Sequence, residues 1–462
     1  MDPTRHSHQG LRIGNIDELC SHGLKDLRAD ALGIAQVGLA ACDGFKATVD
    51  AVSLTGNGVA ISGRELALKP GARVVVLGAG KATLPIAEAL EAVLGERIDA
   101  GAVILRRGEV ADLEHIEVYI ADHPLPSRES VTGALRLEAL ANQVGADDLV
   151  LACFTGGSSA LACLPPEGIT FEDKRLLHEI LLGSGMPIAE VNSVRKHVSR
   201  IKGGRLAERI APARIVNLTV SDVAGDVLDV LTDLTVPDTS TVADAVSVLH
   251  DYGLWEQLPN SITGFLHTQR AESPDLDGVD ITTEILVGGV GVCELMSEEA
   301  RTRGYAPVVL TTTLEGEARE MGRFIADMAL SSANSSYPFS PGTVLLGCGS
   351  ENAVAISNKG AFGNGGPCQE AALAAAMELD GSQIVALFMD TDGSDGGTDA
   401  AGAIADGSTT NRAAEADLDL RRALMQHAAK EPLERLGDLI FSGATGTNVN
   451  DLFVVVIGGK ES

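Results

Sequence analysis

The sequence has no long apolar run. No stretch of 18 consecutive apolar residues occurs among its 462 residues, whereas a helix that spans a bilayer needs about 20. The polar N-terminal segment also has no apolar core of the kind that a secretory signal requires. We therefore expect no membrane span and no signal peptide, and an N-terminus that is frayed.

Cysteine is sparse and has no paired spacing. The seven cysteines are an odd number, and no two of them form a C-x-x-C pair. This pattern excludes a disulfide framework and argues against a structural zinc site. A cytoplasmic location is the expectation that fits best.

Positive charge is scarce as well. The chain has 35 lysines and arginines against 64 aspartates and glutamates, which gives a formal net charge of −29. So acidic a chain argues against nucleic acid and anionic membranes as partners. Basic residues that cluster here therefore predict a site for an anion.

Strands and helices alternate over most of the chain. Its length corresponds to about two to three domains, and the alternation predicts an α/β fold with helices on both faces of a mostly parallel sheet. Residues 259–280 lose the periodicity and gain proline, aspartate and glycine. We expect an N-terminal domain over 26–258, a linker over 259–280, a C-terminal domain over 281–460, and a cleft between the domains.

The expected elements follow from apolar periodicity. The expected strands are 73–77, 102–105, 118–121, 148–154, 215–220, 284–287, 307–312, 343–347, 384–389 and 452–457. The expected helices include 26–54, one that ends at Gly95, 130–144, 195–210, 317–329, 369–379 and 413–427.

A glycine loop follows the first strand. Gly78, Gly80 and Lys81 lie where a helix begins, so free N–H groups and a lysine would favour an anion. Ala82 after the lysine excludes a Walker A loop, and Thr83 at the third glycine position excludes a dinucleotide fingerprint. A glycine turn with a surface lysine is the alternative.

A second loop, Gly156, Gly157, Ser158 and Ser159, follows the fourth strand. It predicts a second phosphate cradle. The alternative is a hydrolase nucleophile elbow with Ser158 as the nucleophile. That interpretation requires a late histidine, and His427 has no evident acid partner.

The strongest anion signal is the basic segment 192–205. It has five lysines and arginines within eleven positions. On one continuous helix, Arg195 and Lys202 would share a face, and Lys196 and Arg200 the next. A solvated or salt-bridged face is the alternative.

A loop rich in carboxylates follows the strand at 384–389. Asp390, Asp392, Asp395 and Asp399 would repel one another unless something positive lies among them. We predict a metal site with Asp392, Asp395 and Asp399 as ligands, and a solvated acidic loop as the alternative. The spacing excludes an EF-hand.

Further polar residues lie at other predicted strand and helix ends. Asp222 could hold a metal or accept a substrate hydroxyl proton, or could cap a helix. Glu370 begins a helix, where it would complement the dipole. Thr445, Asn448 and Asn450 could hydrogen-bond hydroxyl groups. Together with the glycine loops, these residues suit phosphoryl transfer, which depends mostly on positioning and charge neutralisation.

Six ordered motifs resemble the glycerate 2-kinases of the MOFRL type, which older annotations name hydroxypyruvate reductases. The motifs are GAGKA at 78–82, TGGSSAL at 155–161, NSVRKHVSRIKGGRLAE at 192–208, SDVAGD at 221–226, TDGSDGGTDAAGAIADGST at 391–409 and TGTNVNDL at 445–452.

The resemblance implies phosphorylation of the 2-hydroxyl of D-glycerate with ATP and Mg²⁺. It implies a Rossmann-like N-terminal domain and a C-terminal MOFRL domain. It assigns catalytic roles to Lys81, Asp222 and Asp392, and places Arg195 in the cleft. The expected partner is a small acid, with no nucleic acid and no membrane, and a homodimer is left open.

The chain also departs from the family pattern. Pro367 stands where the family has a functional arginine, and Glu351 lies in a segment that replaces the family's G-G-E-T. We keep Glu351 as a candidate ligand contact. A related sugar acid as substrate, a reductase and a non-catalytic sugar-acid binder are the alternatives.

Overall fold

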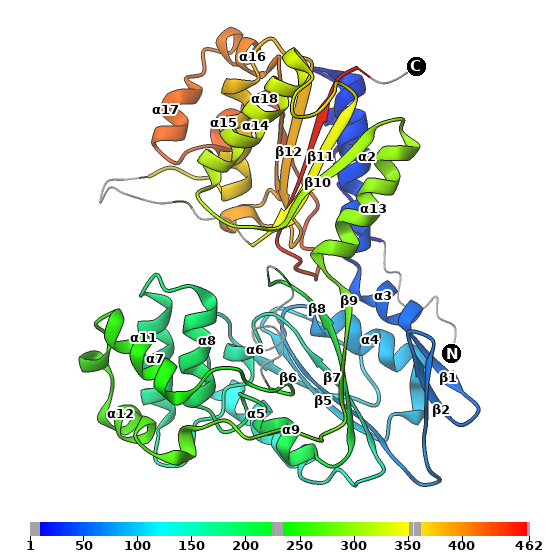
Figure 1. The fold of residues 1–462 in the computed structure, drawn as a ribbon, viewed down its shortest axis with the longest axis vertical. Helices are drawn as coiled ribbons and strands as arrows, with labels where there is room; N and C mark the ends of the chain where they lie inside the picture. Colours follow the sequence, from blue (N-terminus) through cyan, green and yellow to red (C-terminus); the bar gives the residue numbers. More distant parts are fainter. Residues whose placement is uncertain (1–9, 224, 226–233, 351–353, 355–361, 460–462) are drawn as a thin grey trace. The chain divides into compact units, whose positions relative to one another are not determined.

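The computed structural model describes residues 10–223, 225, 234–350, 354 and 362–459. Backbone contacts divide the chain into two compact units (Figure 1). Among the described residues, unit 1 comprises 44–221 and 234–286, whereas unit 2 comprises 10–43, 222, 223, 225 and those from Val287 onward. Within the described residues, no helix is both long and apolar enough to cross a membrane.

Unit 1 is built on a six-stranded sheet in the order β6-β5-β4-β7-β8-β9. The first five strands in this order run parallel, which confirms the predicted mostly parallel sheet. Every residue of β4 and β7 is buried, because helices cover both faces of the sheet. The strands are β4 (Val74–Ala79), β5 (Ala100–Arg106), β6 (Glu117–Ala121), β7 (Leu149–Phe154), β8 (Arg214–Val220) and β9 (Ile281–Val287).

Two groups of helices in unit 1 pack around separate apolar cores. Helix α5 packs with α9 against the sheet, and α7, α8, α11 and α12 share a separate apolar core. The helices are α3 (Gly44–Ala51), α4 (Thr83–Leu94), α5 (Arg128–Ala141), α6 (Ser158–Leu161), α7 (Phe171–Leu182), α8 (Ile188–His197), α9 (Arg205–Ile210), α11 (Val242–Asp251) and α12 (Asn260–Leu266). Helix α4 ends before Gly95 as predicted.

A small antiparallel sheet and three 3-10 turns also belong to the described part of unit 1. They are β1 (Val52–Thr55), β2 (Gly58–Ile61), β3 (Arg64–Ala67), η1 (Gly95–Arg97), η2 (Trp255–Gln257) and η3 (Gln269–Ala271).

Unit 2 has a mixed sheet in the order β10-β11-β15-β12-β13-β14. Strand β15, from the end of the chain, lies antiparallel between β11 and β12. The strands are β10 (Ala306–Leu314), β11 (Thr343–Gly349), β12 (Ile384–Asp390), β13 (Gly402–Asp406), β14 (Leu439–Ile440) and β15 (Asp451–Ile457).

Helices cover both faces of this sheet. Helices α14 and α15 pack on one face, and α2 lies beside α13 on the other (Figure 1). The helices are α1 (Ile16–Leu19), α2 (Lys25–Ala41), α13 (Gly289–Thr302), α14 (Ala318–Ser335), α15 (Pro367–Glu378), α16 (Thr409–Glu415), α17 (Leu420–Met425) and α18 (Lys430–Leu436), with the turn η4 (Asp395–Gly397).

Three predicted helices are broken in the structure. Residues 26–54 form α2 in unit 2 and α3 in unit 1, followed by the start of β1. Residues 195–210 end one helix at His197 and begin another at Arg205, because two adjacent glycines disfavour helix between them. Residues 413–427 break at Asp417, whose φ is 56°. Apolar residues keep their helical spacing on both sides of each break, so periodicity alone did not reveal the breaks.

The domain junction also differs from the expectation. The expected linker 259–280 contains α12, whose Ile262 and Leu266 are buried in the core of unit 1. Strand β9, expected in the C-terminal domain, completes the sheet of unit 1. The apolar pattern of a segment predicts a strand, but it does not predict which sheet that strand joins.

Candidate active site

The two predicted glycine loops lie side by side in unit 1. Strands β4 and β7 are parallel neighbours, so the loops that follow them emerge at the same sheet edge. The backbone N–H of Lys81 donates to the carbonyl oxygen of Gly156 at 2.8 Å. Gly78 itself lies inside β4, and Ser158 and Ser159 begin α6. The two glycine motifs therefore form a pair of hydrogen-bonded loops at one edge of the sheet.

Glycine is required where these loops approach each other. Gly80 has a φ of 146°, and a Cβ there would lie 2.1 Å from Thr155 Oγ1. Gly157 has a φ of 86°, and a Cβ there would lie 3.2 Å from Lys81 Cγ. Both positions favour glycine for conformation and for space. The side chain of Lys81 thus lies directly against the backbone of the second loop.

The basic segment brings two of its cations to the same loop region. Lys202 is fully buried, and its Nζ lies 3.4 Å from the carbonyl oxygen of Ser158. Arg195, in the last turn of α8, is also buried. Burial raises the thiol pKa of Cys163, and the charges of Lys202 and Arg195 oppose that rise. The two cations therefore converge, although the single helix that predicted it does not exist.

The other basic residues of this segment have structural partners. Lys196 pairs with the buried carboxylate of Asp238 at 3.0 Å. Arg200 pairs with Glu138, and Arg205 donates to four backbone carbonyls. The salt-bridged interpretation is thus correct for part of the segment.

Sequence reasoning missed Lys174. This fully buried lysine of α7 donates to the backbone carbonyls of Val198 and Arg195. Its charge also acts on the Cys163 thiol. The signal was available, because Lys174 stands on the apolar stripe that Leu177 and Leu181 define.

His123 was also missed. Its ring lies over the second glycine loop, where a Cβ on Gly157 would be 3.2 Å from His123 Nε2. Burial and then the charges of Lys81, Arg106 and Arg195 lower the pKa of His123 to about 4. A lone histidine after a predicted strand carries no signal of this environment.

The acidic loop of unit 2 is tied to the loop before β15. Thr445 Oγ1 donates to the carbonyl of Thr391 at 2.7 Å, and Asn450 Nδ2 donates to the carbonyl of Asp222 at 2.5 Å. Asn448 Oδ1 accepts the N–H of Asn450 at 2.8 Å. The segments that carry Asp222, Asp392, Thr445, Asn448 and Asn450 therefore come together.

Asp390 and Asp451 complete this acidic region. They face each other in the register of β12 and β15, and both are buried. Asp390 Oδ1 accepts the backbone N–H of Asp392 at 2.8 Å. The sequence motif placed Asp390 in the loop but did not identify Asp451 as its neighbour.

The three predicted metal ligands do not form one cluster. Asp395 Oδ1 and Oδ2 accept the N–H groups of Cys368 and Gln369 at the start of α15. Burial first, and then Asp451, raise the pKa of Asp395 to about 8. Asp399 is exposed and pairs with Lys430 at 2.6 Å. Over the described ranges, no group of three or more His, Cys, Asp or Glu residues could hold a metal ion.

Glu370 lies in an ion-pair network. Its Oε1 is 2.8 Å from His427 Nδ1, and its Oε2 is 3.9 Å from an Arg319 nitrogen. Burial raises the pKa of Glu370, and His427 and Arg319 oppose the rise. His427 thus has an acid partner, but the structure links it to Glu370 in unit 2, whereas Ser158 belongs to unit 1.

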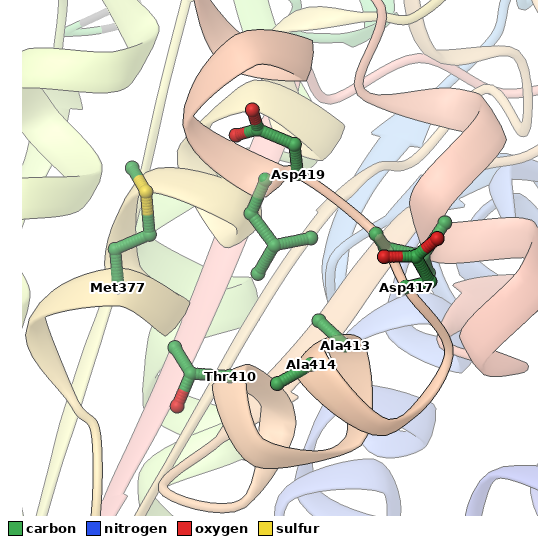
Figure 2. Close-up of a pocket in the computed structure, with 8 residues that line it drawn as sticks. Met377, Thr410, Ala413, Ala414, Asp417 and Asp419 are labelled. Atoms are coloured by element: carbon green, nitrogen blue, oxygen red, sulfur yellow. The ribbon is translucent and has the colours of Figure 1, made fainter.

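Two pockets that described residues line contain none of these predicted residues. A pocket of about 400 Å³ lies between α15, α16 and α17, lined by Met377, Ala413 and Asp417 among others (Figure 2). A second pocket, of about 610 Å³, contains Arg200 and Arg205. The predicted Glu351 lies outside the described residues.

Known proteins resemble this chain along nearly its whole length. Residues 30–267 match a family described as a domain of unknown function (DUF4147), and residues 343–451 match the MOFRL family. The chain is 36% identical to a glycerate 2-kinase of Pyrococcus horikoshii, over 94% of this chain and 98% of that protein.

The chain belongs to the glycerate kinase family. It is also 38% identical to a D-glycerate 2-kinase of Thermotoga maritima, over 83% of this chain and 91% of that protein. A crystal structure of a glycerate kinase from the same organism matches with a TM-score of 0.81 and 34% identity, covering 92% of this chain and 97% of that one. These family members confirm the resemblance and the two-domain α/β fold.

Proposed function

We propose that this chain phosphorylates the 2-hydroxyl of D-glycerate, or of a closely related polyhydroxy acid, with ATP as the donor. The observation that carries the proposal is the convergence of Lys81, Arg195 and Lys202 around the paired glycine loops. In a chain with a net charge of −29, cations that gather at one pair of glycine loops favour an anionic ligand there. Family membership narrows that anion to a phosphate or a small carboxylate.

The reaction requires little covalent chemistry from the protein. The terminal phosphoryl group leaves the β-phosphate oxygen of ATP and bonds to the C2 hydroxyl oxygen, and the hydroxyl proton passes to a carboxylate. Lys81 and the neighbouring cations would neutralise the charge that spreads over the transferring group. Asp222 and Asp392 are the proposed partners of the hydroxyl.

The acidic region fits a role in binding Mg²⁺. Proteins hold this ion through one or two carboxylates, while waters and substrate phosphates supply the other ligands. Asp390 and Asp451, which face each other at buried positions, provide such a donor pair beside the Asp392 loop. In this proposal, Asp390 and Asp451 take the place of Asp395 and Asp399 as the metal ligands. Asp395 instead accepts a backbone N–H at the start of α15, and Asp399 pairs with Lys430. The ion would supply further neutralisation of phosphate charge.

A substrate screen tests the proposed activity. The protein is incubated with ATP and Mg²⁺ and with D-glycerate or sugar acids of four to six carbons, and ADP and phosphorylated acids are identified by mass spectrometry. We expect D-glycerate or a close analogue to yield a 2-phosphorylated product. NADH oxidation with hydroxypyruvate in the absence of ATP, or ligand binding without any transfer, would contradict the proposal. A cytoplasmic location and a homodimer are further proposals that the screen does not address.

A further inference from the structure

Part of the basic segment 192–205 faces a pocket away from the glycine loops. Lys202 contacts the second glycine loop, whereas Ser199, Arg200 and Arg205 line the pocket of about 610 Å³ in unit 1. The described residues that line this pocket include none of those assigned to phosphoryl transfer. The proposed function therefore leaves this part of the basic segment without a role.

The pocket lies between the two groups of helices in unit 1. Arg205 and Arg209 belong to α9, which packs in the core beside the main sheet. Phe265 belongs to α12 and Arg270 to η3, next to the core that α7, α8, α11 and α12 share. A ligand bound in this pocket would therefore contact both groups.

Arginine is concentrated in this pocket. Four arginines and three glutamates line it, whereas acidic residues outnumber basic ones by 64 to 35 in the whole chain. Two of these arginines, Arg200 and Arg209, share a single carboxylate, that of Glu138 on α5. The local charge is thus more positive than that of the chain as a whole, which favours an anion over a cation as the ligand.

The arginines also carry donors that a ligand can use. Glu138 accepts Nε and Nη2 of Arg200, which leaves the two N–H groups of Nη1 outside this ion pair. Arg270 lies over the ring of Phe265 and contacts Glu167 through Nη2 at 3.4 Å. The side chains of Arg270 and Glu167 are 62% and 87% exposed, so this ion pair is weak. An anion can therefore replace Glu167 as the partner of Arg270.

Ser199 adds a buried hydroxyl to the lining. Its residue is 2% exposed, and its Oγ accepts the backbone N–H groups of Ile201 and Lys202 at 3.3 and 3.2 Å. These two bonds occupy the lone pairs of the oxygen and leave the O–H as a donor. The pocket thus combines a hydroxyl donor with guanidinium donors, which phosphate and carboxylate oxygens accept.

We propose that this pocket is a second anion site, which binds a small molecule with phosphate or carboxylate groups through Arg200 and Arg270. Planar guanidinium groups match such oxyanions with paired hydrogen bonds. Because the ligand displaces Glu167 from Arg270, removal of that carboxylate charge increases the affinity. Because the ligand joins the two helix groups of the folded unit, it also raises the melting temperature.

Calorimetric titration of the full chain tests the proposal. Pyrophosphate and citrate are the probes for the two kinds of anion, and both are titrated without divalent metal. The Lys81→Ala variant separates this pocket from the glycine loops, because it removes a cation from the loops alone. We expect at least one probe to bind to this variant. Binding of pyrophosphate alone assigns a phosphate ligand, binding of citrate alone assigns a carboxylate ligand, and binding of both assigns a site that accepts either group.

Two substitutions in the Lys81→Ala background address the pocket itself. Arg270→Gln should weaken binding about tenfold or more, and Glu167→Gln should strengthen it about threefold. The replaced side chains are more than half exposed, so the fold should be retained. In wild-type protein, Arg270→Gln should also reduce the rise in melting temperature that the probes cause.

The matched control is Arg128→Gln. Arg128 likewise pairs with a glutamate, Glu172, and lies over a phenylalanine ring, that of Phe171. It is not among the described residues that line the pocket, so its substitution should leave the affinity unchanged. Binding of neither probe to Lys81→Ala, or binding that Arg270→Gln leaves unchanged, overturns the inference.

This inference stands or falls independently of the proposed function. The titrations contain no ATP, glycerate or metal ion, so their outcome does not depend on phosphoryl transfer. Anion binding that Arg270→Gln weakens would confirm the second site even in a protein that transfers no phosphate. Glycerate phosphorylation together with the absence of probe binding to Lys81→Ala would refute the second site and leave the kinase function standing.

Discussion

At the residue scale, Lys81 is the side chain on which the proposed chemistry depends most. Its backbone joins the two glycine loops, and its side chain lies against Gly157. In phosphoryl transfer a single well-placed cation contributes a large share of the charge neutralisation. No neighbouring residue on the same loop carries a charge that could replace it.

Lys81→Ala is expected to lower kcat/KM for ATP-dependent phosphorylation by about a thousandfold or more. The backbone hydrogen bond to Gly156 remains, so the melting temperature should change little. The control is Lys69→Ala, which removes an exposed lysine paired with Asp147 and should retain full activity. Full activity in Lys81→Ala would refute the role of this lysine.

Asp395 illustrates why residue type alone does not assign a role. Four aspartates in one glycine-rich loop share the same chemistry, but the backbone turns them toward different partners. Asp395 holds the start of α15 and Asp399 reaches Lys430. Only the path of the backbone distinguishes a helix cap from a ligand.

At the element scale, the paired loops after β4 and β7 are the feature that positions the site. The sheet brings the two strand ends together, and the absence of a side chain at Gly80 lets the loops touch. A Cβ at this position would also lie 2.7 Å from the carbonyl oxygen of Thr155, a backbone atom that cannot rotate away.

Gly80→Ala is therefore expected to separate the loops, to lower kcat/KM at least about a hundredfold through misplacement of Lys81, and to destabilise unit 1 by about 2–3 kcal/mol. Gly71→Ala is the matched control, because Gly71 also has a positive φ, of 84°, but its Cβ would meet nothing within 4 Å. It should cost only about 1–2 kcal/mol of backbone strain and leave kcat unchanged. Equal kinetics in the two variants would contradict the proposed loop contact.

At the scale of the whole molecule, residues 10–43 belong to unit 2 although they precede unit 1 in the sequence. Helix α2 packs on β12 and β15, and Arg28 forms ion pairs with Asp406 and with Asp438, the latter at 2.8 Å. All three side chains are fully buried. Burial alone would raise the pKa of Asp438, but hydrogen bonds from His22 and the charges of Arg28 and Arg412 hold it below its usual value.

Arg28→Ala is expected to destabilise unit 2 by about 3–5 kcal/mol, because it leaves buried carboxylates uncompensated. The depressed pKa values of Asp406 and Asp438 stabilise the fold above the unfolded pKa, and this stability is lost as the pH falls through the folded pKa. Urea unfolding from pH 7 to pH 3 should therefore show a smaller acid dependence in Arg28→Ala. Lys46→Ala, which breaks an exposed pair with Asp50, is the control. Parallel pH curves for wild type and Arg28→Ala would contradict this interpretation.

Much of the fold was predictable from the sequence. The strands of the sheet in unit 1, the helix that ends at Gly95 and the two glycine loops follow from the order of residues within each segment. Apolar runs and glycine turns were predictable because their conformation depends mainly on neighbouring residues in the sequence. The divided helices and the segment 259–280 were not predictable, because a break or a docking partner is decided by packing with distant residues.

The sequence by itself determined the alternation of strands and helices, the family, and the residue types of a site for phosphoryl transfer. Tertiary structure decided which of those residues meet. It placed Lys81, Arg195 and Lys202 together with the unforeseen Lys174 and His123, and it brought Asp451 opposite Asp390. The physical reason is that the residue type alone sets which groups a side chain carries. The electric field and the hydrogen-bond partners that shift its pKa and orient it come from elements far apart in the chain.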